Sequence, residues 1–136
     1  MDAATRDFVR RRAAGRCEYC LLRQEHCDLT HHVEHIVAKQ HGGSDDAGNL
    51  APACHRCNLR KGPNLTAIDP VTHEVVPLFH PRSNDWAEHF IVDSERIVGI
   101  TPVGRATVQL LAMNDARRLE LRTHILSSGE QPGRIE

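Results

Sequence analysis

Residues 31–62 read HHVEHIVAKQHGGSDDAGNLAPACHRCNLRKG, which places histidines, a glutamate, two asparagines and two cysteines in a short span. The segment LTHHVEHIVA is rich in β-branched residues and runs into the turn-forming QHGGSDDAGN, so it predicts two short strands or one bent arm of a hairpin. The segment CHRCNLRKG predicts a short helix that is stopped by Gly62 and Pro63. The stretch therefore predicts extended chain, a glycine turn and a helix in immediate succession.

Two cysteine pairs bracket most of this stretch. Cys17 and Cys20 form one CxxC pair, and Cys54 and Cys57 form the other. At this spacing two thiolates on a tight turn reach one tetrahedral ion, so the two pairs predict a structural zinc site with four thiolate ligands. The alternatives are buried free thiols or a redox pair, but a redox pair needs only one CxxC near a βαβ unit. Four thiolates leave no coordination position for water, so any reaction must use other residues.

The composition predicts a small protein with a thin aliphatic core. The chain has 136 residues, 4% aromatic residues and a formal net charge of −1, which favours one domain and excludes a global basic field. The sequence has neither the apolar region of a secretory signal nor a run of membrane-spanning length, so we expect a soluble, cytoplasmic protein with no membrane partner. A reducing compartment and the odd count of five cysteines argue against a disulfide framework, and Cys27 is expected to be an ordinary free cysteine.

Outside the central stretch, the pattern predicts a helix at the start, hairpins in the middle and two helices at the end. The first helix is expected over residues 3–15, closed by Gly15. TAIDPVTHEVVPLF predicts a hairpin with its turn near residues 69–73, and HFIVD and RIVGI predict two further strands. Thr101 and Pro102 are expected to begin a helix, and Asn114 to cap the last one, in which Leu119, Ile125 and Leu126 lie near one face.

The run VEHIVAKQHGG, the pair NL and the segment CHRCNLRKG together resemble the HNH endonuclease family. In that family an acidic residue precedes a histidine, a GG turn and an Asn-Leu pair follow, and a His or Asn closes the pattern after CxxC. The resemblance covers residues 17–63 and looks like the small bacterial and phage-type members. It implies an α+β fold in a single domain over residues 1–136: a ββα-metal (His-Me finger) core inside a four-cysteine zinc knuckle, then a β-hairpin and C-terminal helical extension over residues 64–128.

The resemblance also implies an activity, the metal-dependent hydrolysis of DNA phosphodiester bonds. It makes His35 the general base that activates water and Asn49 the residue that stabilises the loop and orients the base. It makes Glu34 and Asn58 ligands of a catalytic divalent cation, Mg²⁺ or Mn²⁺, and such hard ions prefer oxygen ligands. Because Asn58 follows Cys57 directly, the zinc would anchor the helix that carries a catalytic ligand.

Two features of the motif leave an alternative open. Glu34 stands where the family more often has Asp, and Asn58 stands where the family name expects His. A flat strand directs adjacent side chains to opposite faces, so His32 and Glu34 would share a face, and a metal site that uses His32 is the alternative. We expect His31 and His41 to be polar surface histidines.

Positive side chains close to the motif predict a polyanionic partner. Lys39, Arg56, Arg60 and Lys61 are the expected phosphate contacts. Arg10, Arg11 and Arg12 fit phosphate contacts and a solvated helix face equally well. The expected partner is therefore DNA, with a homodimer or a protein partner left open. The second functional hypothesis is a catalytically inactive, zinc-stabilised DNA-binding or adaptor module.

Overall fold

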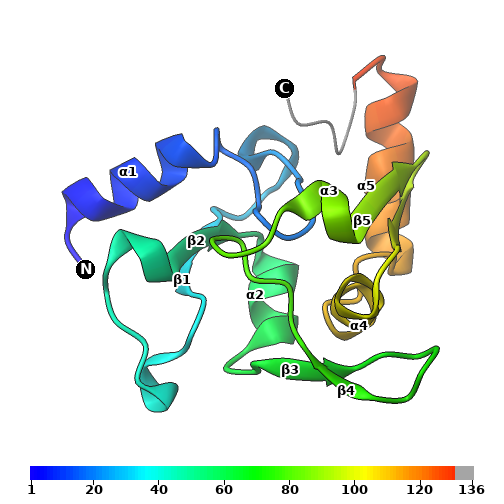
Figure 1. Cartoon of the computed structure of the whole chain (residues 1–136). Helices are drawn as coiled ribbons and strands as arrows, with labels where there is room; N and C mark the ends of the chain where they lie inside the picture. Colours follow the sequence, from blue (N-terminus) through cyan, green and yellow to red (C-terminus); the bar gives the residue numbers. More distant parts are fainter. Residues whose placement is uncertain (131–136) are drawn as a thin grey trace.

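A computed structural model describes residues 1–130 of the chain (Figure 1). The strands pair with their neighbours along the chain, which gives three separate two-stranded antiparallel sheets among these residues. The predicted α+β class is confirmed. The elements in chain order are α1 (Ala3–Arg12), β1 (His32–His35), β2 (Leu50–Ala53), α2 (His55–Lys61), β3 (Thr66–Ile68), β4 (Val75–Pro77), α3 (Trp86–His89), β5 (Phe90–Asp93), β6 (Arg96–Gly99), α4 (Pro102–Leu110) and α5 (Ala116–Ser127).

The central stretch folds as a hairpin followed by a helix. In the β1–β2 hairpin His32 pairs with Ala53 and His35 with Leu50, so β1 is one arm and its partner strand comes only after the glycine loop. Helix α2 begins directly after Cys54, whose sulfur accepts a hydrogen bond from the backbone amide of Cys57. It ends at Lys61 and is followed by Gly62, which has a φ of 50° that favours glycine. The predicted helix is confirmed, and the whole unit has the order ββα.

The first helix is shorter than predicted. It is capped at Asp2, whose carboxylate accepts a hydrogen bond from the amide of Thr5, and it ends at Arg12. Ala14 and Gly15 then adopt positive φ angles of 53° and 72°, so the chain already turns toward the first cysteine before the predicted end of the helix.

Two arginines at the end of α1 hydrogen-bond to the backbone of the central hairpin and its flanking residues. The sequence alone suggests either phosphate contacts or a solvated helix face for them. Arg12 donates hydrogen bonds to the carbonyl oxygens of Ala47 and Leu50, at 2.9 and 2.8 Å. Arg10 donates to the carbonyl oxygen of His31 at 3.2 Å. Arg11 lies on an exposed face, where it pairs with Asp7.

The C-terminal extension follows the predicted order with two local differences. The β3–β4 and β5–β6 hairpins are confirmed, and α4 begins after the Thr101 cap as expected. The cap of α5 is Asp115, because the side chain of Asn114 is used to pair with the backbone N–H and carbonyl of Ile97. The short helix α3 was not predicted, since four residues are too few for a helical period to be read.

A single buried cluster joins the central hairpin to the extension. In Figure 1 the two terminal helices, α1 and α5, lie on opposite sides of the fold, with β1, β2 and α2 between them. The four paired cysteines belong to the same buried cluster as Phe79, Phe90, Leu111, Met113 and Ile125. The hairpin unit and the extension therefore share one core, while residues 131–136 of the expected single domain lie outside the described part. No helix within residues 1–130 has the length and apolarity needed to cross a lipid bilayer.

Candidate functional site

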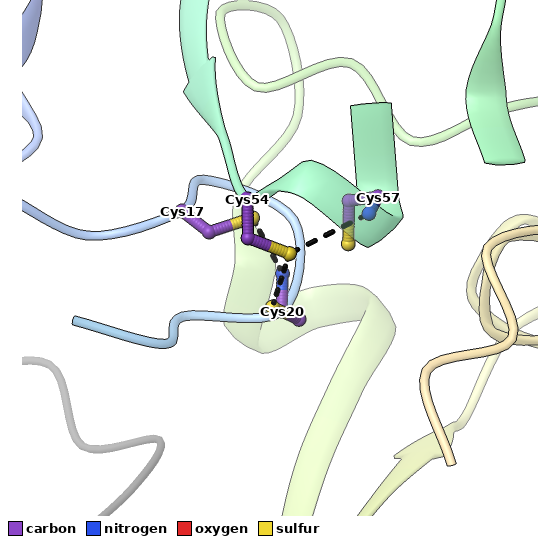
Figure 2. A group of neighbouring side chains, drawn as sticks. All are labelled: Cys17, Cys20, Cys54 and Cys57. Carbon is purple, nitrogen blue, oxygen red and sulfur yellow. Dashed lines mark hydrogen bonds between the residues drawn. The ribbon is translucent and has the colours of Figure 1, made fainter. Parts of the chain in front are cut away.

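The four cysteines of the two CxxC pairs converge in the core (Figure 2). Cys17 and Cys20 come from the loop after α1, and Cys54 and Cys57 from the start of α2. All four are buried, and their sulfur atoms lie within 4.8 Å of one another, with 3.6 Å between those of Cys20 and Cys54. Tetrahedral zinc with Zn–S bonds of about 2.3 Å needs sulfur atoms about 3.8 Å apart. The cluster is consistent with the predicted structural zinc.

The buried cluster needs a cation if its thiols are to ionise. Within each pair a backbone amide donates to a sulfur at 3.5 Å, from Cys20 to Cys17 and from Cys57 to Cys54. Burial raises the pKa of Cys17 and of Cys57, so these thiols would stay protonated without a compensating positive charge. A bound cation supplies that charge and deprotonates its thiol ligands. The fifth cysteine, Cys27, is half-buried, and burial raises its pKa to about 12, as expected for an unreactive free thiol.

A buried arginine also contacts the cluster, and the sequence analysis missed it. Arg118 of α5 donates from Nη1 to the sulfur of Cys57 at 3.1 Å and from Nη2 to the carbonyl oxygen of Leu111 at 2.6 Å. Its positive charge offsets part of the negative charge of four thiolates. A signal was present in the sequence, because Arg118 and Arg122 share the helical spacing of Ile125 and are buried with it.

The glycine loop between β1 and β2 is closed by Asn49. The Asn49 side chain accepts a hydrogen bond from the amide of Val37 at 2.9 Å and donates to the carbonyl oxygens of Val37 and Ser44 at 3.0 and 2.8 Å. Gly43 packs against the same carbonyl of Val37, where a Cβ atom would lie 1.7 Å from the oxygen, so only glycine fits. Gly42 has a φ of 86°. The GG turn and the middle asparagine therefore hold one tight loop.

His35 stands at the end of β1, where this loop begins. Its Nε2 atom lies 2.7 Å from Oδ1 of Asp45, which is on the loop. Its Nδ1 atom has no hydrogen-bond partner among residues 1–130 and is not buried. The hydrogen bond from His35, followed by that from Lys39, lowers the pKa of Asp45 well below its usual range. His35 thus presents one ring nitrogen to a carboxylate and the other to solvent.

Glu34 points to the other side of β1, toward α2. Its Oε2 atom lies 3.8 Å from Nζ of Lys61, and its Oε1 atom is buried without a hydrogen-bond partner in the described part of the chain. Burial raises the pKa of Glu34 to about 7, against the opposing effect of Lys61. His32 is on the same side of the strand, since its Nε2 atom lies 3.4 Å from Nδ1 of His55 on α2. The alternation along β1 is therefore the one that a flat strand predicts.

Asn58 lies on the face of α2 that contacts β1. It is three residues from both His55 and Lys61, which is the spacing of neighbours on one helix face. Its side-chain amide makes no hydrogen bond within residues 1–130, and its nitrogen and oxygen atoms are accessible to solvent. Glu34 and Asn58 thus lie on two facing elements and offer a carboxylate and an amide oxygen, the kinds of ligand that a hard divalent cation takes, although the carboxylate also interacts with Lys61 and Tyr19.

The four predicted phosphate contacts have different surroundings. Arg60 is exposed and has no ion-pair partner in the described residues, while Lys39 and Arg56 are paired with Asp45 and Asp115. Lys61 is only 2% exposed, and its ammonium donates to the carbonyl oxygen of Ile36 at 2.9 Å. Lys61 is therefore unsuited to a direct phosphate contact in this conformation.

One histidine prediction is wrong. His31 is buried, with Nε2 3.0 Å from the carbonyl oxygen of Leu22, because the chain before β1 folds back against the first cysteine loop. His41 is exposed, as expected.

The segment that carries both the cysteine cluster and the ββα unit also has a family match. Residues 17–64 match the model of the family described as HNH endonuclease. The chain contains an HNH endonuclease domain. The match ends just before β3, so the HNH domain comprises the cysteine loop, the β1–β2 hairpin and α2, and it implies a ββα-metal core. No curated protein and no solved structure matches the chain significantly.

Proposed function

We propose that this protein is a metal-dependent endonuclease that hydrolyses phosphodiester bonds of DNA, with His35 as the general base. The observation that carries the proposal is the position of His35 in the HNH domain. Its imidazole sits where β1 enters the glycine loop, with Nε2 against Asp45 and Nδ1 open to solvent. An open nitrogen of a histidine is suited to take a proton from water near neutral pH.

In the proposed reaction, Nδ1 of His35 removes a proton from a water molecule whose oxygen attacks the phosphorus. The new P–O bond forms as the bond to the leaving oxygen breaks, and the leaving oxygen takes a proton from solvent. A divalent cation held by Glu34 and Asn58 would neutralise negative charge on the scissile phosphate and on the leaving oxygen. Asn49 keeps the loop closed, which fixes His35 at the end of β1, on the side of the strand opposite to Glu34.

Lys61 has a supporting part in this scheme. Its ammonium lies beside Glu34 and donates to the carbonyl of Ile36, so it fastens the end of α2 to the end of β1. The two elements that would hold the cation are thereby fixed to each other. The proposed zinc at the cysteine cluster anchors the other end of α2 through Cys54 and Cys57.

Contact with DNA is proposed for the exposed basic side chains near α2 and the loop. Arg60 is free for phosphate, whereas Lys39 and Arg56 would exchange their carboxylate partners, the exposed Asp45 and the partly buried Asp115, for a phosphate. An exposed ion pair such as that of Lys39 contributes little to stability, so its exchange costs little. The contacts carry no sequence information, because they involve only the backbone of DNA.

One observation favours the alternative of an inactive DNA-binding or adaptor module. Glu34 is buried and lies beside an ammonium group, and its pKa of about 7 means that part of it is protonated at neutral pH. Both features weaken binding of a cation relative to an exposed carboxylate. The alternative thus predicts DNA binding without cleavage.

The experiment that separates the two functions is cleavage of supercoiled plasmid with Mg²⁺ or Mn²⁺ and with EDTA. The proposal predicts nicked or linear product with the divalent cation and none with EDTA. Plasmid that is bound in a gel-shift assay but stays uncut with either cation would favour the inactive module.

A further inference from the structure

We infer that Asp45 is a positioning residue for His35, which fixes the imidazole with its proton on Nε2 and leaves Nδ1 free to accept a proton. The catalytic part of this inference rests on the proposed function, but the state of the imidazole does not. Nothing in the HNH motif itself points to Asp45, which is one of two adjacent aspartates in the loop.

The contact distances single out His35 as the main partner of Asp45. Oδ1 of Asp45 lies 2.7 Å from Nε2 of His35, whereas Nζ of Lys39 and the amino group of Met1 are no closer than 3.3 and 3.4 Å to the carboxylate. The shortest of these distances is typical of a charge-assisted hydrogen bond. The other two contacts add positive charge that keeps the carboxylate ionised.

An ionised carboxylate can only accept hydrogen bonds, and this decides the tautomer. Since Asp45 has no proton to give, Nε2 of His35 must be the donor. The neutral ring then carries its lone pair on Nδ1, the nitrogen that faces solvent.

The loop holds Asp45 in place from both sides. The residue before it, Ser44, accepts a hydrogen bond from Asn49 through its carbonyl oxygen. The residue after it, Asp46, accepts one from the backbone amide of Asn49 at 2.8 Å. Gly43 permits the close approach to Val37 that this geometry needs. The same asparagine that closes the loop therefore also presents Asp45 to His35.

The chain offers a matched set of variants. Asp45→Ala removes the carboxylate, and Asp45→Glu keeps the charge at a longer reach. Asp46→Asn is the control, because Asp46 is the adjacent exposed aspartate, and its side chain makes no hydrogen bond or ion pair among residues 1–130. Lys39→Met tests whether Asp45 acts through Lys39 instead.

The first readout is nitrogen-15 and proton NMR of the His35 ring at about pH 8, without added divalent cation, with the signals assigned by His35→Ala. The inference predicts a downfield, hydrogen-bonded Nε2–H signal and an unprotonated Nδ1 in the wild type, in Asp46→Asn and in Lys39→Met. In Asp45→Ala this hydrogen-bonded signal should disappear. A His35 ring whose signals are the same with and without the Asp45 carboxylate would overturn the inference, whether or not the protein cleaves DNA.

The second readout is the rate of plasmid cleavage. Asp45→Ala should lower kcat about tenfold or more with little change in KM, and Asp45→Glu should recover part of the loss. An unchanged kcat in Asp45→Ala beside an active wild type would overturn the positioning role. If the wild type itself does not cleave while the NMR signature follows Asp45, then the proposed function fails and the His35–Asp45 pair stands.

Discussion

Arg118 of α5 donates a hydrogen bond to the sulfur of Cys57 at 3.1 Å, and both side chains are buried. Cys57 belongs to the matched HNH domain, and Arg118 lies more than fifty residues beyond its end. A second bond from Arg118 to the carbonyl of Leu111 fixes the turn between α4 and α5. The C-terminal helices and the cysteine cluster should therefore stabilise each other.

Replacing Arg118 with glutamine should weaken both parts at once. Loss of a charged, buried hydrogen-bond donor costs about 1.5–3 kcal/mol, so we expect the free energy of unfolding to fall by about that amount. Zinc should also leave faster in a competition with a colorimetric chelator. Arg117→Gln is the control, since Arg117 directly precedes Arg118 in the same helix and is exposed. Equal zinc release from the two variants would show that the bond to Cys57 does not support the site.

The cysteine cluster should hold about one zinc ion per chain. Elemental analysis of freshly purified, reduced protein is expected to find it, and Cys57→Ser should lower zinc content and stability together, because metal binding contributes directly to folding. Cys27→Ser should keep both, since the Cys27 sulfur is outside the cluster. Folded wild-type protein without zinc would contradict this assignment.

The pair of Asp69 and Arg105 predicts a pH dependence of stability. Asp69 is buried and accepts two hydrogen bonds from Arg105, at 2.9 and 2.8 Å, which link the β3–β4 turn to α4. These bonds lower the pKa of Asp69 below its ordinary value of 3.8. A lowered pKa in the folded state means that the stabilisation is fully present above about pH 4 and is lost as the pH falls further.

Urea denaturation of the wild type and of Asp69→Asn tests this dependence. The wild type should be the more stable protein at pH 7, and the difference should shrink at pH 3. A difference that stays constant between these two pH values would mean that ionised Asp69 does not contribute.

Binding to DNA should weaken steeply with salt although the net charge of the chain is −1. Each lost phosphate contact reduces the slope of log K against log salt by about 1, so Arg60→Gln should have a shallower slope than the wild type. Arg96→Gln is the control, because Arg96 is also exposed but begins β6 in the extension. Identical slopes for Arg60→Gln and the wild type would exclude Arg60 from the DNA contacts.

The parts of the site that the sequence could predict are set by local spacing. Each CxxC pair lies within four residues of chain, and the GG turn and Asn49 close one loop. Their pattern alone therefore indicates the zinc site and the hairpin. Burial of charged residues could not be predicted in this way. Lys61 was expected at the surface, but α2 ends against β1, where the ammonium satisfies the Ile36 carbonyl.

Long-range partners explain what else was missed. Arg118 meets Cys57 only because α5 folds back across the core, and the sequence gives no distance between them. Asp45 reaches His35 because the loop turns at Gly43, and a sequence pattern does not show which of two adjacent aspartates faces the histidine. The fold order could be predicted from periodicity and caps, whereas these side-chain contacts depend on the finished packing.

The cleavage rate of His35→Ala tests the central proposal most directly. His32→Ala and His41→Ala serve as matched histidine controls, and zinc content, Tm and DNA binding are measured on each variant. We expect His35→Ala to keep its zinc, its Tm and its DNA binding but to cleave supercoiled plasmid with Mg²⁺ about a hundredfold to ten-thousandfold more slowly than the wild type. Cleavage by His35→Ala at the wild-type rate would contradict the account, and a folded but inactive His32→Ala beside it would move the chemistry to His32.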